Sequence, residues 1–337
     1  MDYFSHGGQV NLFAKQLSCD VSEVIDLSSN INFLKPIVNN IDFNKIDISA
    51  YPMYDKLYTS ISNNYKVKKN EIELFNCEYS SLSALFSFLN QEHCTIYSPS
   101  SLKYKKIATT YSYEYDIINK FTQINRAVKE KSLVIFENPS TVCGKYYNIE
   151  SYLKAWNKLN CIILIDEKYL DFTNYNSVIK YINKYKNLYV LKSISKFYSS
   201  SGIRCGIIIS NSNNIQKLKQ TKSQLSISTY DSLYIQEILK DEVFKNTSKA
   251  ININNFLLLK KILNESKHIK KVFQSDVNFL LLQLNNINAI QVQEQLKKCK
   301  ILIKNCSSFD FLDDSYVRIA VNNEKTILLL KDALNSI

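Results

Sequence analysis

The stretch Leu191–Ile209, LKSISKFYSSSGIRCGIII, decides how the rest of this chain is interpreted. A hydrophobic, β-rich run leads into Lys196, and Arg204 follows eight residues later, between Gly202 and Gly206. The whole chain has only five glycines. In so glycine-poor a sequence, a glycine marks a position where the backbone needs φ > 0 or a close approach.

The lysine and the arginine of this stretch point to a chemistry. A lysine at the end of a buried strand loses its proton easily, and a neutral amine can form a Schiff base with a carbonyl. A nearby arginine can hold a phosphate dianion with its forked donors. Together they are what pyridoxal 5′-phosphate requires. The stretch alone is equally compatible with a strand followed by a solvated basic loop.

Length and composition describe an ordinary globular protein. The chain has 337 residues, of which 45% are hydrophobic and 22% charged, enough for a full core and two domains. No apolar run approaches the roughly 18 residues that span a bilayer. The first residues, MDYFSHGGQV, have neither the basic nor the apolar region of a secretory signal. We therefore expect a cytoplasmic protein.

Cysteine, histidine and charge exclude several classes of site. The eight cysteines form no CxxC pair, which argues against a zinc site and a disulfide framework. Three histidines make a His-centred triad or metal cluster improbable. The net charge of +11 comes from lysines spread through the chain. We expect no nucleic-acid or membrane partner, but a surface suited to small anionic substrates.

The rhythm of the chain predicts an α/β fold. Short β-rich runs, several of them continuously apolar as in LVIF and CIILI, alternate with helix-length segments, which is typical of a mainly parallel sheet. The expected strands are 71–75, 94–97, 115–118, 132–136, 161–165, 188–191 and 205–209. The expected helices are 55–65, 80–89, 102–109, 149–159 and 178–185.

The pattern changes after residue 225 and predicts a smaller α+β domain. It contains a long helical region at 232–266, strands at 278–284, 301–304 and 316–321, and helices at 289–298 and 324–337. We therefore divide the chain into three parts. Residues 1–44 form an arm on the small domain and the active site, 45–225 the large cofactor-binding domain, and 226–337 the small domain.

A carboxylate and a tyrosine extend the candidate site. Asp166 directly follows the apolar run CIILI, and Tyr169 lies three residues further on. A buried aspartate needs a cationic partner, and a protonated pyridine nitrogen would be one. An N-cap aspartate is the alternative for Asp166 taken alone. The order Asp166, Tyr169, Lys196, Arg204 on an alternating strand and helix pattern is more specific than any one of these residues.

This order resembles the fold type I pyridoxal-phosphate enzymes of the aspartate aminotransferase superfamily. IDEKYLDF resembles the motif DEAYIDF of the branch that holds histidinol-phosphate aminotransferase and L-threonine-O-3-phosphate decarboxylase. LKSISKFYSSSGIRCG likewise resembles LRSLTKFYAIPGLRLG. HGGQVNLFAKQL, DLSSNINFLKP and ILIKNCSSFDFLDDSYVRIAV are similar to segments of the decarboxylase. The resemblance covers essentially the whole chain and implies a PLP-dependent transferase-like large domain with a mainly parallel mixed sheet.

The resemblance also implies roles for individual residues. Lys196 would be the catalytic lysine, and Arg318 would bind the substrate α-carboxylate. Tyr51 would reach the cofactor phosphate of a neighbouring subunit, which implies a homodimer with shared sites. The cofactor-binding residues would be Asp166, Tyr169, Ser193, Arg204, Thr141, Glu78, Tyr79 and Tyr51. Lys304, His6 and Asn32 would line the substrate site.

Four positions depart from the family pattern. Thr141 replaces the asparagine of NPxNPTG that bonds the cofactor's phenolic oxygen, and Lys304 replaces an arginine. The aromatic residue that stacks on the pyridine ring falls at Ser101, so that only a movement of Tyr104 could supply a stacking face. The phosphate-cradling turn lacks glycine and reads FNCEY at 75–79.

The decarboxylase-like segments favour decarboxylation of a phosphorylated amino acid, L-threonine or L-serine phosphate. The alternative is an aminotransferase of the histidinol-phosphate type, which Tyr169 favours mildly. A third hypothesis, suggested by Thr141 and Ser101, is a non-catalytic member that binds a ligand without chemistry.

Overall fold

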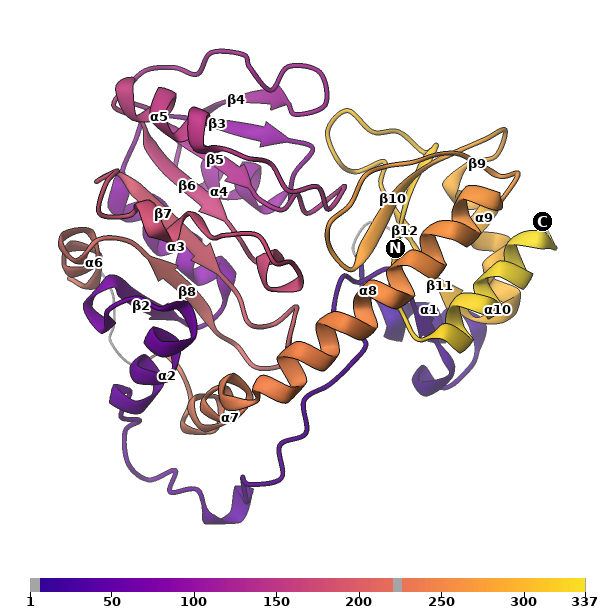
Figure 1. Ribbon diagram of the computed structural model, residues 1–337, viewed down its shortest axis with the longest axis horizontal. Coiled ribbons are helices and arrows are strands. Elements are labelled where there is room, and N and C mark those ends of the chain that lie inside the picture. Colours follow the sequence, from indigo (N-terminus) through magenta and orange to yellow (C-terminus); the bar gives the residue numbers. More distant parts are fainter. Residues whose placement is uncertain (1–6, 221–225, 337) are drawn as a thin grey trace.

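The computed structural model describes residues 7–220 and 226–336, and these form two domains joined by one long helix. In Figure 1 the large domain lies on the left and the small domain on the right, with helix α8, Glu242–Glu265, running between them. None of the helices within these ranges is both long enough and apolar enough to cross a membrane.

A seven-stranded sheet forms the centre of the large domain, in the order β2-β8-β7-β6-β5-β3-β4. The neighbours from β7 to β4 pair in parallel, and β8 pairs antiparallel with both β2 and β7. The predicted α/β class with a mainly parallel mixed sheet is therefore confirmed. The strands are β2 Ile72–Phe75, β3 His93–Ser98, β4 Glu114–Asn119, β5 Leu133–Glu137, β6 Ile162–Asp166, β7 Leu188–Lys192 and β8 Gly206–Ile209.

Helices cover both faces of this sheet because its central strands are apolar on both sides. Along β5, Leu133 and Ile135 belong to one hydrophobic core, and Val134 and Phe136 to the other. This split follows from the alternation of side chains along a strand. One face carries α3 Glu78–Leu89, α4 Lys103–Thr110 and α6 Ser212–Lys219, and the other α2 Asp55–Tyr65, α5 Glu150–Lys158 and α7 Thr229–Lys240.

The small domain is built on a four-stranded antiparallel sheet, β12-β13-β10-β9. Leu259 and Leu263 of α8 pack in its core with strand residues such as Leu280 and Ile319. The N-terminal arm joins this domain, since β1 pairs in parallel with β11. The elements are α1 Val10–Leu17, β1 Ile25–Asp26, β9 Ile269–Val272, β10 Phe279–Leu284, α9 Ala289–Leu296, β11 Ile301–Leu302, β12 Lys304–Asn305, β13 Tyr316–Ala320 and α10 Glu324–Asn335.

The helical region expected at 232–266 consists of two helices. The Asp241 side chain accepts a hydrogen bond from Phe244 N at 2.8 Å, and so caps the start of α8. Ile235 and Ile238 of α7 belong to the core of the large domain. Leu259 and Leu263 of α8 belong to the core of the small domain, so α7 and α8 contribute to different cores.

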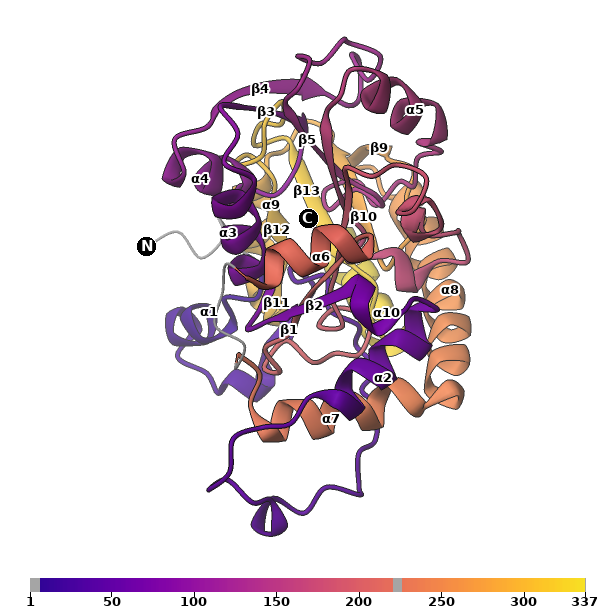
Figure 2. The same cartoon turned by 90° about the vertical axis from the view of Figure 1, so that its left-hand side faces the viewer.

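Two further elements differ from the expectation. The segment 178–185, expected as a helix, forms a 3-10 turn at Val178–Tyr181 followed by further turns. Its first residues are held by Glu167, whose carboxylate accepts hydrogen bonds from Val178 N and the Ser177 hydroxyl. Helix α6 and strand β9 were not expected. Between β1 and α2, the chain loops away from the body of the large domain (Figure 2).

Candidate active site

The loop after β7 carries Lys196 at the carboxyl edge of the large sheet, where ligands of open α/β sheets bind. Burial and the positive charges of Lys168, Arg318 and Arg204 lower the pKa of Lys196, although Tyr169 opposes this shift. A lysine in such surroundings gives up its proton more readily than one in water.

The arm fixes this loop through Asn32. Asn32 N donates to Lys196 O at 2.9 Å, and Asn32 Nδ2 donates to Phe197 O at 2.8 Å. The same amide also bonds Ser248 and Asn252 of α8. Asn32, expected to line the substrate site, therefore uses its amide to tie the arm, the lysine loop and α8 together.

The start of α3 and Arg204 form a corner with several hydrogen-bond donors. Burial opposes ionisation of the Cys77 thiol, but hydrogen bonds from Ser80, Tyr79 N and Arg204 lower its pKa. These donors would serve a phosphate oxygen in the same way, since the N-terminus of a helix favours anions. The Arg204 guanidinium also donates to Ser201 O at 2.7 Å.

Cys77 and Gly206 test the expectation that glycines mark positions with a special backbone requirement. Cys77 has φ of +88°, in a region that costs a non-glycine residue about 1–3 kcal/mol. A Cβ on Gly206 would collide with Ser81 Oγ and with the Cys77 carbonyl, so this glycine permits close approach of β8 and α3. A Cβ on Gly202 would meet no atom within 4 Å. The expectation of a backbone requirement is therefore met at Gly206 and wrong at Gly202.

The carboxylate end of the site is a cluster of charged residues around Asp166. Asp166 ends β6 in register with Glu137 at the end of β5, which brings two carboxylates side by side. Lys168 Nζ lies 3.0 Å from Asp166 Oδ2 and 3.3 Å from Glu137 Oε1. Lys103 Nζ, from α4, also lies 3.0 Å from Asp166 Oδ2 and pairs with Glu78. The buried Tyr104 hydroxyl donates to the same oxygen.

The pKa values of this cluster are shifted in opposite directions. Burial favours the neutral acid, but Lys103 and Lys168 hold the pKa of Asp166 below its ordinary value. Burial likewise opposes the charge of Lys168, but Asp166 and Glu137 raise its pKa above the ordinary value for lysine. Burial lowers the pKa of Lys103, although Asp166 opposes this. These shifts favour an ionised Asp166 carboxylate and a protonated Lys168 beside it.

Two cations of the small domain lie on neighbouring strands, and one of them, Arg318, lowers the pKa of Lys196. Arg318 on β13 pairs directly with Lys304 on β12, and both side chains are buried. The Arg318 guanidinium donates to Thr141 O at 2.6 Å and to Ser28 O at 3.4 Å. Lys304 Nζ lies 3.4 Å from Ser308 Oγ. Like charges on facing strands repel.

The remaining predicted residues occupy different surroundings. Tyr169 packs edge-on against Phe279 of the small domain, with ring centroids 5.2 Å apart. Ser193 Oγ accepts a hydrogen bond from Ser195 N. Tyr79 is partly exposed at the start of α3, and Tyr51 is 84% exposed on the loop before α2, remote from the cluster. His6 lies outside the described residues.

Sequence reasoning missed Lys168, Lys103 and Glu137. One signal was present: Lys168 is a charged residue within IDEKYLDF, an otherwise buried segment, where the family motif DEAYIDF has alanine. Glu137 ends an apolar strand, which is the same signal that singled out Asp166. Nothing in the sequence placed Lys103 of α4 against Asp166.

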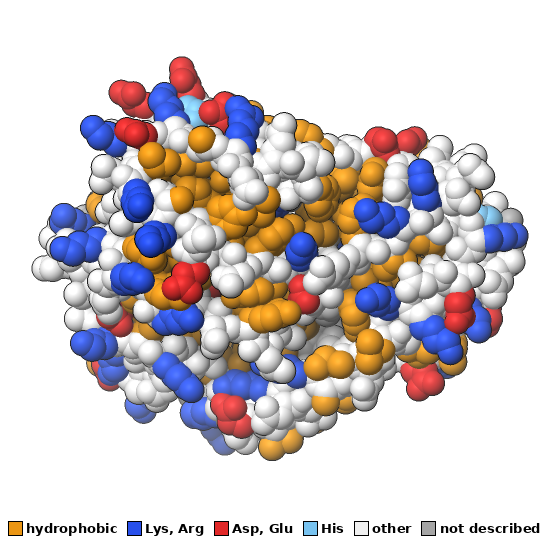
Figure 3. Space-filling view, turned by 45° about the horizontal axis from the view of Figure 1, so that its top comes forward, with side chains coloured by type: hydrophobic (Ala, Val, Ile, Leu, Met, Phe, Trp, Pro, Cys, Tyr) orange, Lys and Arg blue, Asp and Glu red, His pale blue; other side chains and the backbone are white. Residues whose placement is uncertain are grey.

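A separate cavity of about 780 Å³ lies between the two domains. Lys120, Lys145 and Lys271 line it together with aromatic side chains, and no acidic residue does. Figure 3 shows hydrophobic side chains between the domains, and cationic ones scattered over this face rather than gathered in one patch. None of the predicted site residues lines this cavity, so it is not part of the site around Lys196.

A family model described as aminotransferase class I and II matches residues 52–336. A histidinol-phosphate aminotransferase of Clostridium botulinum is 25% identical over 334 residues, which are 94% of this chain and 92% of that protein. The adenosylcobalamin biosynthesis bifunctional protein CobDQ of Leptospira interrogans is 26% identical over 366 residues and matches 100% of this chain. The chain spans 41% of that bifunctional protein.

Solved structures share the fold. The histidinol-phosphate aminotransferase from Clostridium acetobutylicum has a TM-score of 0.83 at 28% identity, with 93% of this chain and 98% of that one covered. The L-threonine-O-3-phosphate decarboxylase from Porphyromonas gingivalis has a TM-score of 0.79 at 21% identity, with 92% and 98% covered, and shows the fold alone. These findings fit the aminotransferase alternative better than the decarboxylase hypothesis favoured by the sequence segments.

Proposed function

Because this chain belongs to the class I and II aminotransferase family, whose cofactor is pyridoxal phosphate, we propose that it is an aminotransferase of the histidinol-phosphate type. Its substrate would be a small phosphorylated amine. The observation that carries the proposal is Lys196, a lysine of lowered pKa set among cations that suit a phosphorylated ligand.

Two parts of the site fit the cofactor. Lys196 supplies an amine that deprotonates readily. The start of α3 and Arg204 would supply donors for the phosphate, and the same groups lower the pKa of the Cys77 thiol. Thr141 Oγ1 is buried and has no partner among the described residues, so it remains able to bond a ligand.

The proposed mechanism assigns each group a task. When bound, the cofactor supplies an aldehyde that reacts with amines and a ring that accepts electrons from the substrate α-carbon. Lys196, as a neutral amine, takes the proton from the substrate α-carbon and later returns it. Arg318 and Lys304 hold the anionic groups of the substrate, and so fix which bond of the α-carbon reacts. Tyr169 and Thr141 would hold the cofactor through their hydroxyl groups.

Decarboxylation of L-threonine or L-serine phosphate is the second candidate. The observation that favours it is the similarity of HGGQVNL and NCSSF to segments of the decarboxylase. The same residues would serve, with the substrate carboxylate rather than the α-hydrogen placed for cleavage. The names of the relatives make the aminotransferase the first choice.

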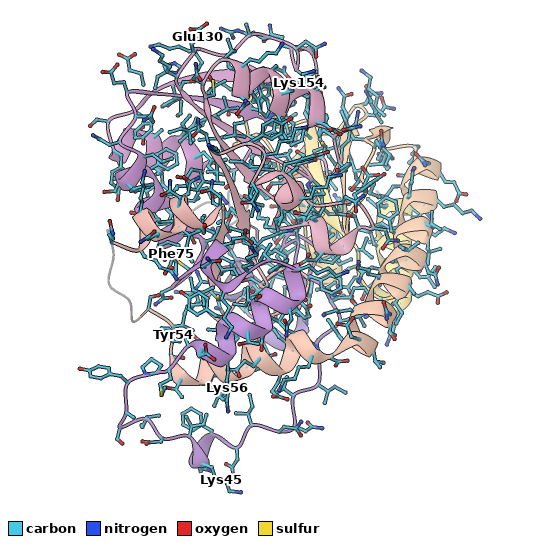
Figure 4. The ribbon with its side chains drawn as sticks, turned by 60° about the vertical axis from the view of Figure 1, so that its left-hand side comes forward. Lys45, Tyr54, Lys56, Phe75, Glu130 and Lys154 are labelled. Carbon is cyan, nitrogen blue, oxygen red and sulfur yellow. The ribbon has the colours of Figure 1, made fainter. Side chains whose placement is uncertain are left out.

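A second copy of the chain is the proposed partner. Tyr51, Met53, Ile48 and Ile37 lie on the loop before α2 and are 78–88% exposed. Figure 4 shows Lys45 at the tip of this loop, away from the body of the molecule. So many exposed apolar side chains suggest an interface, in which Tyr51 would reach the neighbouring site. All eight cysteines are free thiols, which suits the cytoplasm as the proposed location.

The test is an NMR product assay on the purified protein loaded with pyridoxal phosphate. L-Histidinol phosphate, L-threonine phosphate and L-serine phosphate are supplied one at a time, with and without 2-oxoglutarate. Glutamate that appears only with 2-oxoglutarate supports the aminotransferase. Loss of the substrate carboxylate without 2-oxoglutarate identifies a decarboxylase instead. Binding of the cofactor without turnover of any of these amines contradicts both.

A further inference from the structure

The inference concerns the Asp166 cluster and rests on the proposed use of pyridoxal phosphate. Asp166 is the carboxylate expected to pair with the cofactor's protonated ring nitrogen. Its Oδ2 atom is contacted by Lys168 Nζ, Lys103 Nζ and the Tyr104 hydroxyl, and its Oδ1 atom by Lys168 N at 3.0 Å. An ionised carboxylate has about four acceptor sites. Three of these four donors converge on Oδ2, more than the two lone pairs of one oxygen, and Oδ1 receives the fourth.

Charge leads to the same conclusion. Asp166 and Lys168 are both buried, and Lys168 stays protonated because Asp166 and Glu137 raise its pKa. A pyridinium brought to Asp166 would be a further cation beside this ammonium group. Repulsion between two buried cations is costly. A movement of Lys168 away from Asp166 Oδ2 would therefore let the ring nitrogen pair with this oxygen without the Lys168 ammonium group beside it.

Lys168 has other carboxylates to move to. Its Nζ atom already lies 3.3 Å from Glu137 Oε1 and 3.4 Å from Glu78 Oε1. Glu137 Oε2 is buried and has no partner among the described residues, so it can accept another hydrogen bond. A shift of Lys168 from Asp166 to Glu137 would keep the ammonium paired throughout.

We propose that Lys168 competes with the cofactor for Asp166. In the protein without cofactor, the Lys168 ammonium pairs with Asp166, and it must shift to Glu137 and Glu78 before the cofactor's ring nitrogen pairs with Asp166. The affinity for pyridoxal phosphate is then set by this exchange, since only the fraction of molecules with Asp166 vacated is competent to bind.

The test is a titration of the cofactor-free protein with pyridoxal phosphate, followed by the visible absorbance of the bound cofactor. Lys168→Met removes the ammonium group and keeps the length of the side chain. The dissociation constant for pyridoxal phosphate is expected to fall at least about tenfold. This is the change expected if about one tenth of the wild-type molecules have Asp166 free for the cofactor. Lys154→Met is the matched control, because Lys154 is exposed on α5 (Figure 4) and is not one of the residues paired in the cluster. It should bind like the wild type.

The double variant Lys168→Met/Glu137→Gln covers the case in which the single variant does not fold, since it removes one charge of each sign. Tighter binding in either variant supports the proposal. If the wild type binds the cofactor and the folded variant binds it no more tightly, the proposal about Lys168 is wrong. The proposed aminotransferase function is not affected by that result. If wild type and variants all fail to bind the cofactor, the proposal and the proposed function both fall.

Discussion

Lys196 and Lys168 stand at the same edge of the large sheet, and their surroundings are opposite. The charged neighbours that shift the pKa of Lys196 most, apart from Tyr169, are the cations Lys168, Arg318 and Arg204, which lower it. Lys168 lies within 3.4 Å of three carboxylates, and two of them raise its pKa. The two lysines share a residue type and a place in the fold, yet one is prepared to lose a proton and the other to keep it.

The difference shows that a position at a strand end does not by itself make a lysine reactive. Lys192, the last residue of β7, is a third example: it is buried, pairs with Glu167 at 2.8 Å and lies over the Tyr65 ring. The partners that decide between these roles come from separate segments of the chain. Variants of each lysine can test the contrast.

The largest effect is expected for Lys196→Ala. Removal of the amine proposed to transfer the proton should lower kcat for transamination about 10²- to 10⁴-fold, the range for loss of a general base. Steady-state rates with L-histidinol phosphate and 2-oxoglutarate measure it, and Lys154→Ala serves as the control. The reactive role of Lys196 is wrong if the variant keeps a tenth of the wild-type rate.

A smaller effect, on stability rather than rate, is expected for Lys192→Met. This change leaves the buried Glu167 carboxylate without its cation, which should cost about 3 kcal/mol of the free energy of unfolding. Urea denaturation followed by circular dichroism measures the loss. The double variant Lys192→Met/Glu167→Gln removes the Glu167 charge as well, so most of the stability should return. Equal instability of the single and double variants would assign the loss to packing instead.

Most of the fold could be predicted because its signals are local. Strand β5, LVIFE, is apolar on both faces, and this continuous pattern is the mark of a buried parallel strand. The 178–185 segment could not be predicted, because Glu167, a residue at the end of β6, holds its first turn. Helices α7 and α8 were predicted as one helical region. Asp241, which caps α8, lies between two segments with a helical pattern and does not mark a break in it.

The site was predictable where one segment contains it and hidden where several segments meet. Lys196 and Arg204 stand eight residues apart in one segment, and the order Asp166, Tyr169, Lys196, Arg204 together with the family resemblance singled them out. The neighbours of Asp166 come from β5, α4 and the turn after β6, and only the sheet register and the helix packing bring them together. The expected pairing of Asp166 with a cation holds, but the cations within the structure are lysines.

The smallest effect is a pair of opposite shifts in titration. In the cofactor-free protein the pKa of Lys196 is lowered from 10.5 and that of Lys168 is raised from the same value. Competitive acetylation with acetic anhydride, analysed by mass spectrometry over a range of pH, measures the pH midpoint for each lysine. The midpoint is independent of how accessible the amine is. Lys196 should react with a midpoint below that in the urea-unfolded chain, and Lys168 with one above it.

These shifts also have a sign for stability. Between its lowered pKa and 10.5, Lys196 is neutral in the folded protein and protonated in the unfolded chain, so its contribution to stability rises with pH in that window. Lys168 contributes stability that is fully present below pH 10.5 and is lost as the pH rises through its raised pKa. Equal midpoints for the two lysines would mean that their charged neighbours do not distinguish them, and the contrast between a reactive and a retained lysine would have to rest on geometry alone.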